Sequence, residues 1–314
     1  MGTKLMGKSV LLSIALLLTA AIPAPAETHI VPGNYATIQQ AINNSNDGDV
    51  VVVEPGKYFE TINFLGKNII VTSTDPDNRE IIATTIIDGN GQGSVVTFEN
   101  GETPEAVLTG FTITGGYGTV NPLFGVGGER IWIWGAGIYC DHASPTIKGN
   151  VITNNNGPVR IERNQIVAAG YGGAIGCIES DAIITHNIIR GNSAYAGAGI
   201  MTFMGAEPTF AGPTISNNLI YNNSAYVGGG AAALLGCGRL INNTIVGNDA
   251  SLLQEAGETG IGGNICIESD PQFPPCQIIN NIVCNAKSGG GIFSTGLRED
   301  LRAFFNNVWN NAGG

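Results

Sequence analysis

A repeated unit constrains this chain more than any other feature of its sequence. In each copy a short β-branched run leads to a polar pair containing Asn, and a second apolar run is closed by another Asn. The anchoring residues of the six copies are separated by 37, 31, 25, 38 and 26 residues; they are Asn150, Asn187, Asn218, Asn243, Asn281 and Asn307. A minimum near 25 with longer intervals indicates a fixed structural unit that carries loops of variable length.

Each unit contains three short runs that read as strands. They are rich in Ile, Val and Thr and bounded by Gly or Asn. The third, Gly-rich run follows the variable loop; its copies are 137–140, 174–177, 199–202 and 291–294. Three strands per unit, repeated head to tail, predict an all-β, single-stranded solenoid in which each strand pairs in parallel with its copy one turn away. That architecture is a parallel β-helix.

The composition agrees with such a coil. Gly accounts for 46 of 314 residues, and 12% of the residues are charged, about half the usual share. These values disfavour long helices, charge-laced coiled coils and charged disordered chains, and collagen is excluded because the Gly residues have no three-residue period. In a stacked coil, Gly and Asn suit the tight corners, and a buried Asn can hydrogen-bond to the rungs above and below.

The N-terminal residues resemble a targeting segment. Lys4 and Lys8 precede an apolar run at 10–18, and 24–26 ends in the small residues that a signal peptidase accepts. We therefore expect a signal peptide at 1–26 and a secreted or cell-surface protein without a later transmembrane segment, a retained N-terminal anchor being the alternative. One β-helix domain is expected over 27–314, truncated at its C-terminus because the chain stops within a repeat.

A short helix is expected just after the leader. Residues 37–42 have an amphipathic pattern that Asn34 or Thr37 could cap. Strands are expected at 50–54 and 58–62. A helix placed there would cover the open end of the coil, where the first rung exposes its pairing edges.

The charge balance limits the partners. Residues 27–314 hold 12 basic and 25 acidic side chains, a net charge of −13. Such a surface repels nucleic acid and anionic membranes, so no nucleic-acid partner is expected. It also repels bare polyanionic glycans unless a divalent cation intervenes. The six Cys show no CxxC spacing, which disfavours zinc; Cys237 and Cys276 are expected to be spatial neighbours.

Two sets of motifs resemble a known family. The run 37–41, the Gly48-Asp49-Val50 turn and the segment 53–69 are similar to the N-terminal part of pectate-lyase-like right-handed parallel β-helix proteins. Residues 110–116, 135–140 and 144–147 resemble secreted bacterial repeat-type members of that superfamily. The resemblance implies a right-handed coil that binds carbohydrate along the sheet of Gly-rich strands. It leaves activity open, because the superfold hosts lyases, hydrolases, esterases, epimerases, adhesins and non-catalytic proteins.

Two adjacent insertions carry the candidate sugar-binding residues. The stretches 117–134 and 155–171 precede successive Gly-rich strands and should project from the same edge, one rung apart. Aromatic rings can stack on sugars, and guanidinium groups can hydrogen-bond to hydroxyls or carboxylates. The candidate substrate-binding residues are Trp132, Trp134, Tyr139, Arg160 and Arg163. The alternative is that both Trp side chains fold the loop onto the coil and the charges are solvated.

A literal repeat supplies the candidate calcium ligands. The pentapeptide Cys-Ile-Glu-Ser-Asp occurs at 177–181 and again at 266–270. Glu and Asp two residues apart share a face of an extended strand and could hold Ca²⁺, which gives the candidates Glu179, Asp181, Glu268 and Asp270. The copies should lie three rungs apart, too far to share one ion, and a turn-forming role for Ser-Asp is the alternative.

Catalytic candidates lie at the same corner of the coil. Asp141 with Glu179 or Asp181 is the one carboxylate pair that we expect at a spacing suited to glycoside hydrolysis. His142 adjoins Asp141, but neighbours on a strand point to opposite faces. The outward positions of the Gly-rich strands, among them Tyr139 and Met201, are aromatic or apolar, so no lyase set is matched.

The sequence therefore favours a glycan-binding or cell-surface structural module. A polysaccharide lyase or glycoside hydrolase working in a groove over the Gly-rich sheet, with or without Ca²⁺, is the alternative hypothesis. A scaffold that binds nothing is the third.

Overall fold

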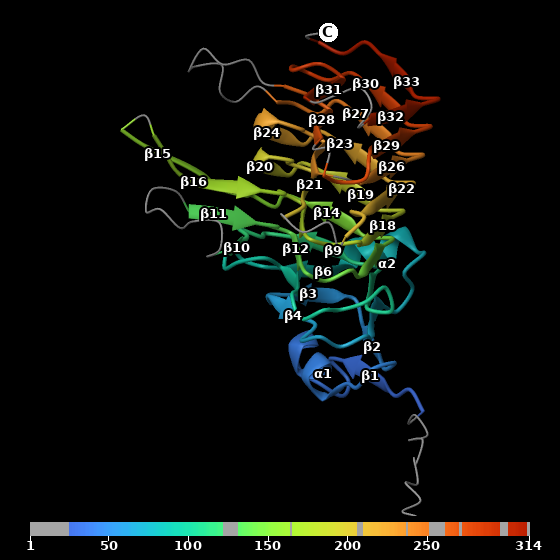
Figure 1. The fold of residues 1–314 in the computed structure, drawn as a ribbon. Coiled ribbons are helices and arrows are strands. Elements are labelled where there is room, and N and C mark those ends of the chain that lie inside the picture. Colours follow the sequence, from blue (N-terminus) through green and yellow to red (C-terminus); the bar gives the residue numbers. More distant parts are fainter. Residues whose placement is uncertain are drawn as a thin grey trace, which may run out of the picture.

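Stacked parallel strands form the body of the molecule. The computed structural model describes residues 25–121, 131–163, 165–205, 210–236, 238–250, 261–269, 272–295 and 301–312. Residues 1–24 of the expected signal peptide, Cys237 and Asp270 lie outside these residues. Three long sheets, A, B and C, run along the coil, and the chain visits them in that order once per turn (Figure 1).

The strands are short and β-branched, as the repeats predicted. Sheet A contains β1 (Thr28–Val31), β2 (Val50–Val53), β5 (Ile70–Ser73), β8 (Val107–Thr109), β13 (Thr146–Lys148), β18 (Ile183–Thr185), β22 (Thr214–Ser216), β26 (Arg239–Ile241), β29 (Cys276–Ile279) and β32 (Leu301–Phe304). Sheet B contains β3 (Gly56–Tyr58), β6 (Thr85–Asp88), β9 (Thr112–Thr114), β14 (Val151–Thr153), β19 (Ile188–Arg190), β23 (Leu219–Tyr221), β27 (Thr244–Val246), β30 (Ile282–Cys284) and β33 (Asn307–Trp309).

The Gly-rich strands make sheet C, and the insertions make a fourth sheet. Sheet C contains β4 (Ile62–Asn63), β7 (Val96–Phe98), β12 (Ile138–Asp141), β17 (Ile175–Ile178), β21 (Ile200–Phe203), β25 (Ala232–Gly236), β28 (Ile265–Ser269) and β31 (Ile292–Thr295). Sheet D contains β10 (Thr119–Val120), β11 (Ile131–Trp134), β15 (Val159–Glu162), β16 (Gln165–Tyr171), β20 (Ser193–Ala196) and β24 (Ser224–Gly228). Sheets A, B and C confirm the all-β, right-handed parallel β-helix.

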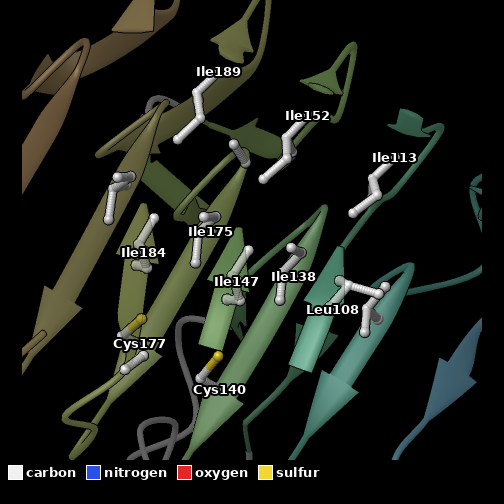
Figure 2. Close-up of a cluster of buried hydrophobic side chains, with 14 of the residues drawn as sticks. Leu108, Ile113, Ile138, Cys140, Ile147, Ile152, Ile175, Cys177, Ile184 and Ile189 are labelled. Atoms are coloured by element: carbon white, nitrogen blue, oxygen red, sulfur yellow. The ribbon is translucent and has the colours of Figure 1, made fainter. Parts of the chain in front are cut away.

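Inward side chains stack in rows along the coil. Ile147 of β13 pairs in register with Ile184 of β18, and both are fully buried. Figure 2 shows such rows, with Cys140 and Cys177 adjacent on neighbouring rungs. Burial of an aliphatic side chain contributes about 1.5–3 kcal/mol, so these rows supply most of the driving force for stacking.

A row of Asn amides runs along the corner between sheets A and B. Each Asn donates its backbone N–H and its side-chain Nδ2 to the Oδ1 of the next, with Nδ2 to Oδ1 distances of 3.0–3.2 Å. The members of this first ladder are Asn150, Asn187, Asn218, Asn243, Asn281 and Asn306. The expected anchor Asn307 was wrong, because Asn307 pairs with Ile282 in the strand itself.

A second ladder follows sheet B. Its members are Asn155, Asn192, Asn223, Asn248, Asn264 and Asn311. Ala286 occupies the place where this ladder needs its next Asn, and its backbone N–H donates to Asn311 Oδ1. Asn264, which precedes strand β28, fills the gap by accepting from Asn248 Nδ2 at 2.9 Å.

The corner before each ladder residue explains the polar pairs in the sequence. Asn217, which precedes Asn218, has a left-handed φ of 55°. Asn and Gly tolerate this region better than other residues. The first residue of the pair therefore turns the chain, and the second enters the coil.

Helix α1 (Ile38–Asn44) closes the N-terminal end of the coil. Ile38, Ala41 and Ile42 are buried against the first strands. Thr37 caps the helix by accepting from the Gln40 N–H at 3.1 Å, which confirms one of the two expected caps. The expected strand at 58–62 is wrong in its bounds, since the chain turns between β3 and β4.

A second helix, α2 (Arg79–Thr84), was not anticipated and lies between β5 and β6. No helix in the described part of the chain is long and apolar enough to cross a membrane.

The ladders should be a main source of stability. Replacement of Asn155 by Ala leaves the buried Gly116 N–H and Ile113 C=O without their side-chain partner. Two such groups should lower the free energy of unfolding by about 2–5 kcal/mol, measured by urea denaturation. Its neighbour Asn156 is exposed and accepts one bond from Ser193, so Asn156→Ala should cost less than about 1 kcal/mol. Equal losses would show that the ladder does not carry this stability.

Candidate functional site

The two insertions lie side by side, as their positions predicted. Strand β11 pairs in parallel with β16, with Trp132 opposite Ala169. Strands β10 and β15 flank this pair in antiparallel fashion. The β15–β16 hairpin projects from the coil (Figure 1).

Sheet D covers the outer face of sheet C. Its strands turn back sharply onto sheet C, for example at Gly172, where φ is 73° and an added Cβ would lie 2.4 Å from the Ile175 carbonyl oxygen. The outer cluster between the two sheets comprises Trp134, Tyr139, Ala169, Tyr171, Ile178, Ala196, Met201, Ala233 and Cys266. The open carbohydrate groove expected over the Gly-rich strands does not run along β12, β17, β21 and β25, because outward side chains of these strands pack under a second layer.

This cluster determines which of the candidate sugar-binding rings are accessible. Trp134 is 0% exposed and Tyr139 2%, so neither ring has a face on which a sugar could stack. Trp132 is half-buried, and its ring stacks on Tyr171 with centroids 5.1 Å apart.

The candidate Arg residues lie apart from the Trp132 ring. Both Arg160 and Arg163 are exposed, on β15 and in the turn after it, and Arg160 forms an ion pair with Glu162. The register puts Trp132 opposite Ala169 and Arg160 opposite Ala168, hence on opposite faces of sheet D. The expected joint patch of Trp and Arg does not form.

A hydrogen-bonded network centred on His142 lies at the C-terminal ends of strands β12 and β17 of sheet C. Nδ1 of His142 lies 2.6 Å from Asp141 Oδ1, and Nε2 lies 2.6 Å from Glu179 Oε2 on the next rung. The His142 side chain is 54% exposed, whereas the two carboxylates are each 19% exposed. The structure thus joins two of the three catalytic candidates through one imidazole.

The backbone explains why sequence reasoning underrated His142. His142 has a φ of 50° and Glu179 a φ of 44°, so both lie at a corner where the strand alternation has ended. The left-handed corner brings His142 back to Asp141 instead of to the opposite face. Period-2 reasoning applies to extended strands and fails at such a corner.

Buried partners hold Asp141. Tyr139 donates its hydroxyl proton to Asp141 Oδ2 at 2.7 Å, and Asn121 Nδ2 donates to the Tyr139 hydroxyl at 2.8 Å. Burial, and then the hydrogen bond to Asp141, raise the pKa of Tyr139 well above its ordinary value. Asn121 was not a sequence candidate, because nothing in the insertion's pattern distinguishes it from a loop Asn.

The two contacts of His142 fix the number of protons that the network must contain. A carboxylate accepts and does not donate, so each imidazole–carboxylate contact needs its own proton. The His142 ring and the two carboxyl groups must therefore share two protons while both contacts are made. Glu179 is also confined from behind, since a Cβ on Gly205 would lie 1.8 Å from its Oε1. The arrangement could donate or accept a proton at the exposed imidazole.

Asp181 does not join the network. Its Oδ1 accepts the backbone N–H groups of Ala211 and Gly212, at 2.7 and 2.8 Å. This is the turn-stabilising role that was the alternative for the Ser-Asp pair. Glu179, with its left-handed φ, does not share an extended strand face with Asp181 either.

The literal Cys-Ile-Glu-Ser-Asp repeat is not a structural repeat. The two copies lie three rungs apart as expected, but through the intervening strands Cys177 aligns with Ile267 and Ile178 with Glu268. A shift of one residue reverses the faces, so Cys177 points into the core and Cys266 into the outer cluster. Burial and the nearby Glu268 raise the pKa of the Cys266 thiol to about 11.

The calcium candidates form no ligand set. Among the described residues no group of three or more acidic, His or Cys side chains is placed to hold a metal ion. Asp270 lies outside these residues.

Comparisons with known proteins give little more. No known family profile and no curated protein matches the chain. Among solved structures, the pectin methyl esterase of the rice weevil is similar, with 11% identity, 90% of this chain and 88% of that chain covered, and a TM-score of 0.37. At these values the likeness says nothing about activity.

Tyr139 should make stability depend on alkaline pH. An unfolded Tyr ionises near pH 10, whereas folded Tyr139 keeps its proton to higher pH. Its contribution is complete below about pH 10 and should fall by about 1.4 kcal/mol per pH unit above it. Tyr139→Phe lacks this loss, so urea denaturation between pH 8 and 11 should show the gap between wild type and variant narrowing. A constant gap would contradict this.

Proposed function

We propose that this protein is a secreted or cell-surface β-helix module that binds glycans on the half-exposed edge of sheet D. The targeting-like residues at 1–26 support export. The support for binding comes from a row of aromatic rings on sheet D.

The observation that carries the proposal is this aromatic row. Trp132 stacks on Tyr171, and Tyr171 meets Tyr195 edge to face at a centroid distance of 5.7 Å. The three residues come from successive rungs of sheet D, so the row runs along the coil axis. Trp132 and Tyr195 are half-buried, which leaves ring surface on which successive sugars of a chain can stack.

The cover over sheet C favours a binding module over the expected enzyme groove. Met201 and Ala233, which face outward at the centre of sheet C, are 1% and 3% exposed. A polysaccharide cannot reach these positions while sheet D stays in place. Its approach is then limited to the half-exposed edge of sheet D and to the rim of sheet C.

Loss of the row should weaken glycan retention. Trp132→Ala combined with Tyr195→Ala should lower the affinity for a retained polysaccharide at least about 10-fold, because two stacking surfaces disappear. Affinity electrophoresis in gels that contain neutral or uronate polysaccharides measures this. Trp309→Ala is the control, since Trp309 is an exposed ring on β33, outside sheet D. Unchanged retention of the polysaccharide in the double variant would contradict the proposal.

The His142 network favours a second candidate function, glycoside hydrolysis. Asp141 and Glu179 flank one exposed imidazole, and hydrolysis requires one proton-donating and one ionised group beside the scissile bond. A polysaccharide could reach this site from the rim of sheet C.

Incubation with a panel of polysaccharides, with and without Ca²⁺, tests for hydrolysis and for lyase action. New reducing ends, or unsaturated uronate absorbance, that disappear in Glu179→Gln would establish an enzyme. Asp181→Asn is the control, because Asp181 holds a turn outside the network. No product from any polysaccharide would leave the binding module as the function.

A further inference from the structure

A cleft unconnected with sheet D lies between helix α2 and the outer face of sheet B. It has a volume of about 460 Å³, within the range of about 300–1,000 Å³ typical of small-ligand sites. Helix α2 packs on β6 and β9 (Figure 1), and Thr112 Oγ1 donates to the Ile82 carbonyl oxygen at 2.8 Å. The cleft therefore has one wall from an inserted helix and one from the coil.

The floor of the cleft is apolar. Val151 of β14 and Ile188 of β19 are in register on neighbouring rungs, and Ile82 of α2 lines the cleft as well. Both Val151 and Ile188 are half-buried, so they keep surface that a ligand can cover. A pyranose ring with C–H groups on one face suits such a floor.

The rim of the cleft is cationic in a chain that is acidic as a whole. Arg79 of α2 and Arg190 of β19 both line it and are exposed. Within the described residues neither guanidinium forms an ion pair, unlike Lys57 and Arg160, which do. Among the described residues, two of the 12 basic side chains of 27–314 thus line one cleft without an ion-pair partner.

Three further groups complete the rim. His186 lies at a corner with a φ of 57°, and its Nδ1 is 2.8 Å from Thr185 Oγ1. Tyr221 is in register with Arg190 on the next rung, and Asp77 precedes α2. A carboxylate and a phenol are suited to sugar hydroxyls, and Asp77 would oppose a multiply charged group such as phosphate.

We propose that this cleft binds a saccharide that carries a carboxylate, such as a uronic acid residue of a short oligosaccharide. The Arg79 and Arg190 guanidiniums would hold the carboxylate through charge-assisted hydrogen bonds, and the sugar ring would pack on the apolar floor. This goes beyond the proposed function and takes from it only that the ligand is a saccharide.

The cleft also bears on the net charge of −13, which repels long polyanions. The two guanidiniums, which form no ion pair, offset that repulsion within this cleft but not along the whole length of a polyanionic polysaccharide. A short acidic segment should therefore bind at least as well as a long acidic polymer, per site.

The test compares a uronate trisaccharide with its carboxyl-reduced, neutral counterpart by calorimetry on the full chain. The uronate should bind and the neutral compound should bind at least about 10-fold more weakly. Arg79→Gln with Arg190→Gln should weaken uronate binding at least about 10-fold. The matched control is Arg239→Gln with Arg302→Gln, two exposed Arg residues of sheet A, and should change it less than about 2-fold.

Four results would overturn the assignment: no uronate binding, equal binding of the neutral compound, equal losses in both double variants, or competition by inorganic sulfate at matching concentration. Trp132→Ala separates the two proposals. If that variant loses neutral-polysaccharide retention but keeps uronate binding, the cleft stands as a separate site. If it abolishes uronate binding, the ligand lies on the aromatic row and the cleft assignment fails.

Discussion

Hydrogen bonding of side-chain amides inside the corners is the constraint on which this coil depends. A corner turns backbone N–H and C=O groups inward, where neither water nor a neighbouring strand can pair with them, and buried orphan groups are costly. An Asn amide is suited to this place because it donates and accepts at once. Asn218 satisfies the Ile184 carbonyl and the Asn187 N–H, and donates to Asn243 as well.

The ladders separate what must be constant from what can vary. Rung stacking is fixed at the corners, so the connection between β14 and β17 can include the projecting β15–β16 hairpin without disturbing sheets A and B. Sheet D is a consequence of this freedom. Its strands add an outer apolar layer over strands of sheet C, such as β17, that pair on both sides with their neighbours along the coil.

The coil could be predicted from the sequence, but only part of its surface could. The positions of the first five anchor Asn residues, the three runs per unit and the capping Thr37 all follow from local physics, and the structure confirms them. The outer cluster did not follow, because an outward Tyr139 or Met201 looks the same whether solvent or a second sheet covers it. The prediction from the pentapeptide repeat failed for a related reason. Identical residues do not fix the pairing register, and a shift of one residue moves every side chain to the opposite face of the sheet.

The candidate sites depend on features that sequence spacing does not report. His142 contacts Glu179 because a left-handed corner redirects it, and neither dihedral can be read from the residue types. The Arg79–Arg190 cleft joins residues that are more than 100 positions apart, one of them on a helix that sequence reasoning missed. In contrast, the proximity of the two insertions followed directly from the period of the coil.

The place of Asn264 in the second ladder shows what defines a turn of this coil. The amide enters from the start of β28, while the position that the period assigns to it holds Ala286. What the coil requires is thus an amide at a point in space, which any adjacent segment can deliver. Turns could then be gained, lost or spliced from unrelated sequence without interrupting the hydrogen-bonded column. A count of turns made from the Asn spacing of the second ladder alone would miss the one that Asn264 completes.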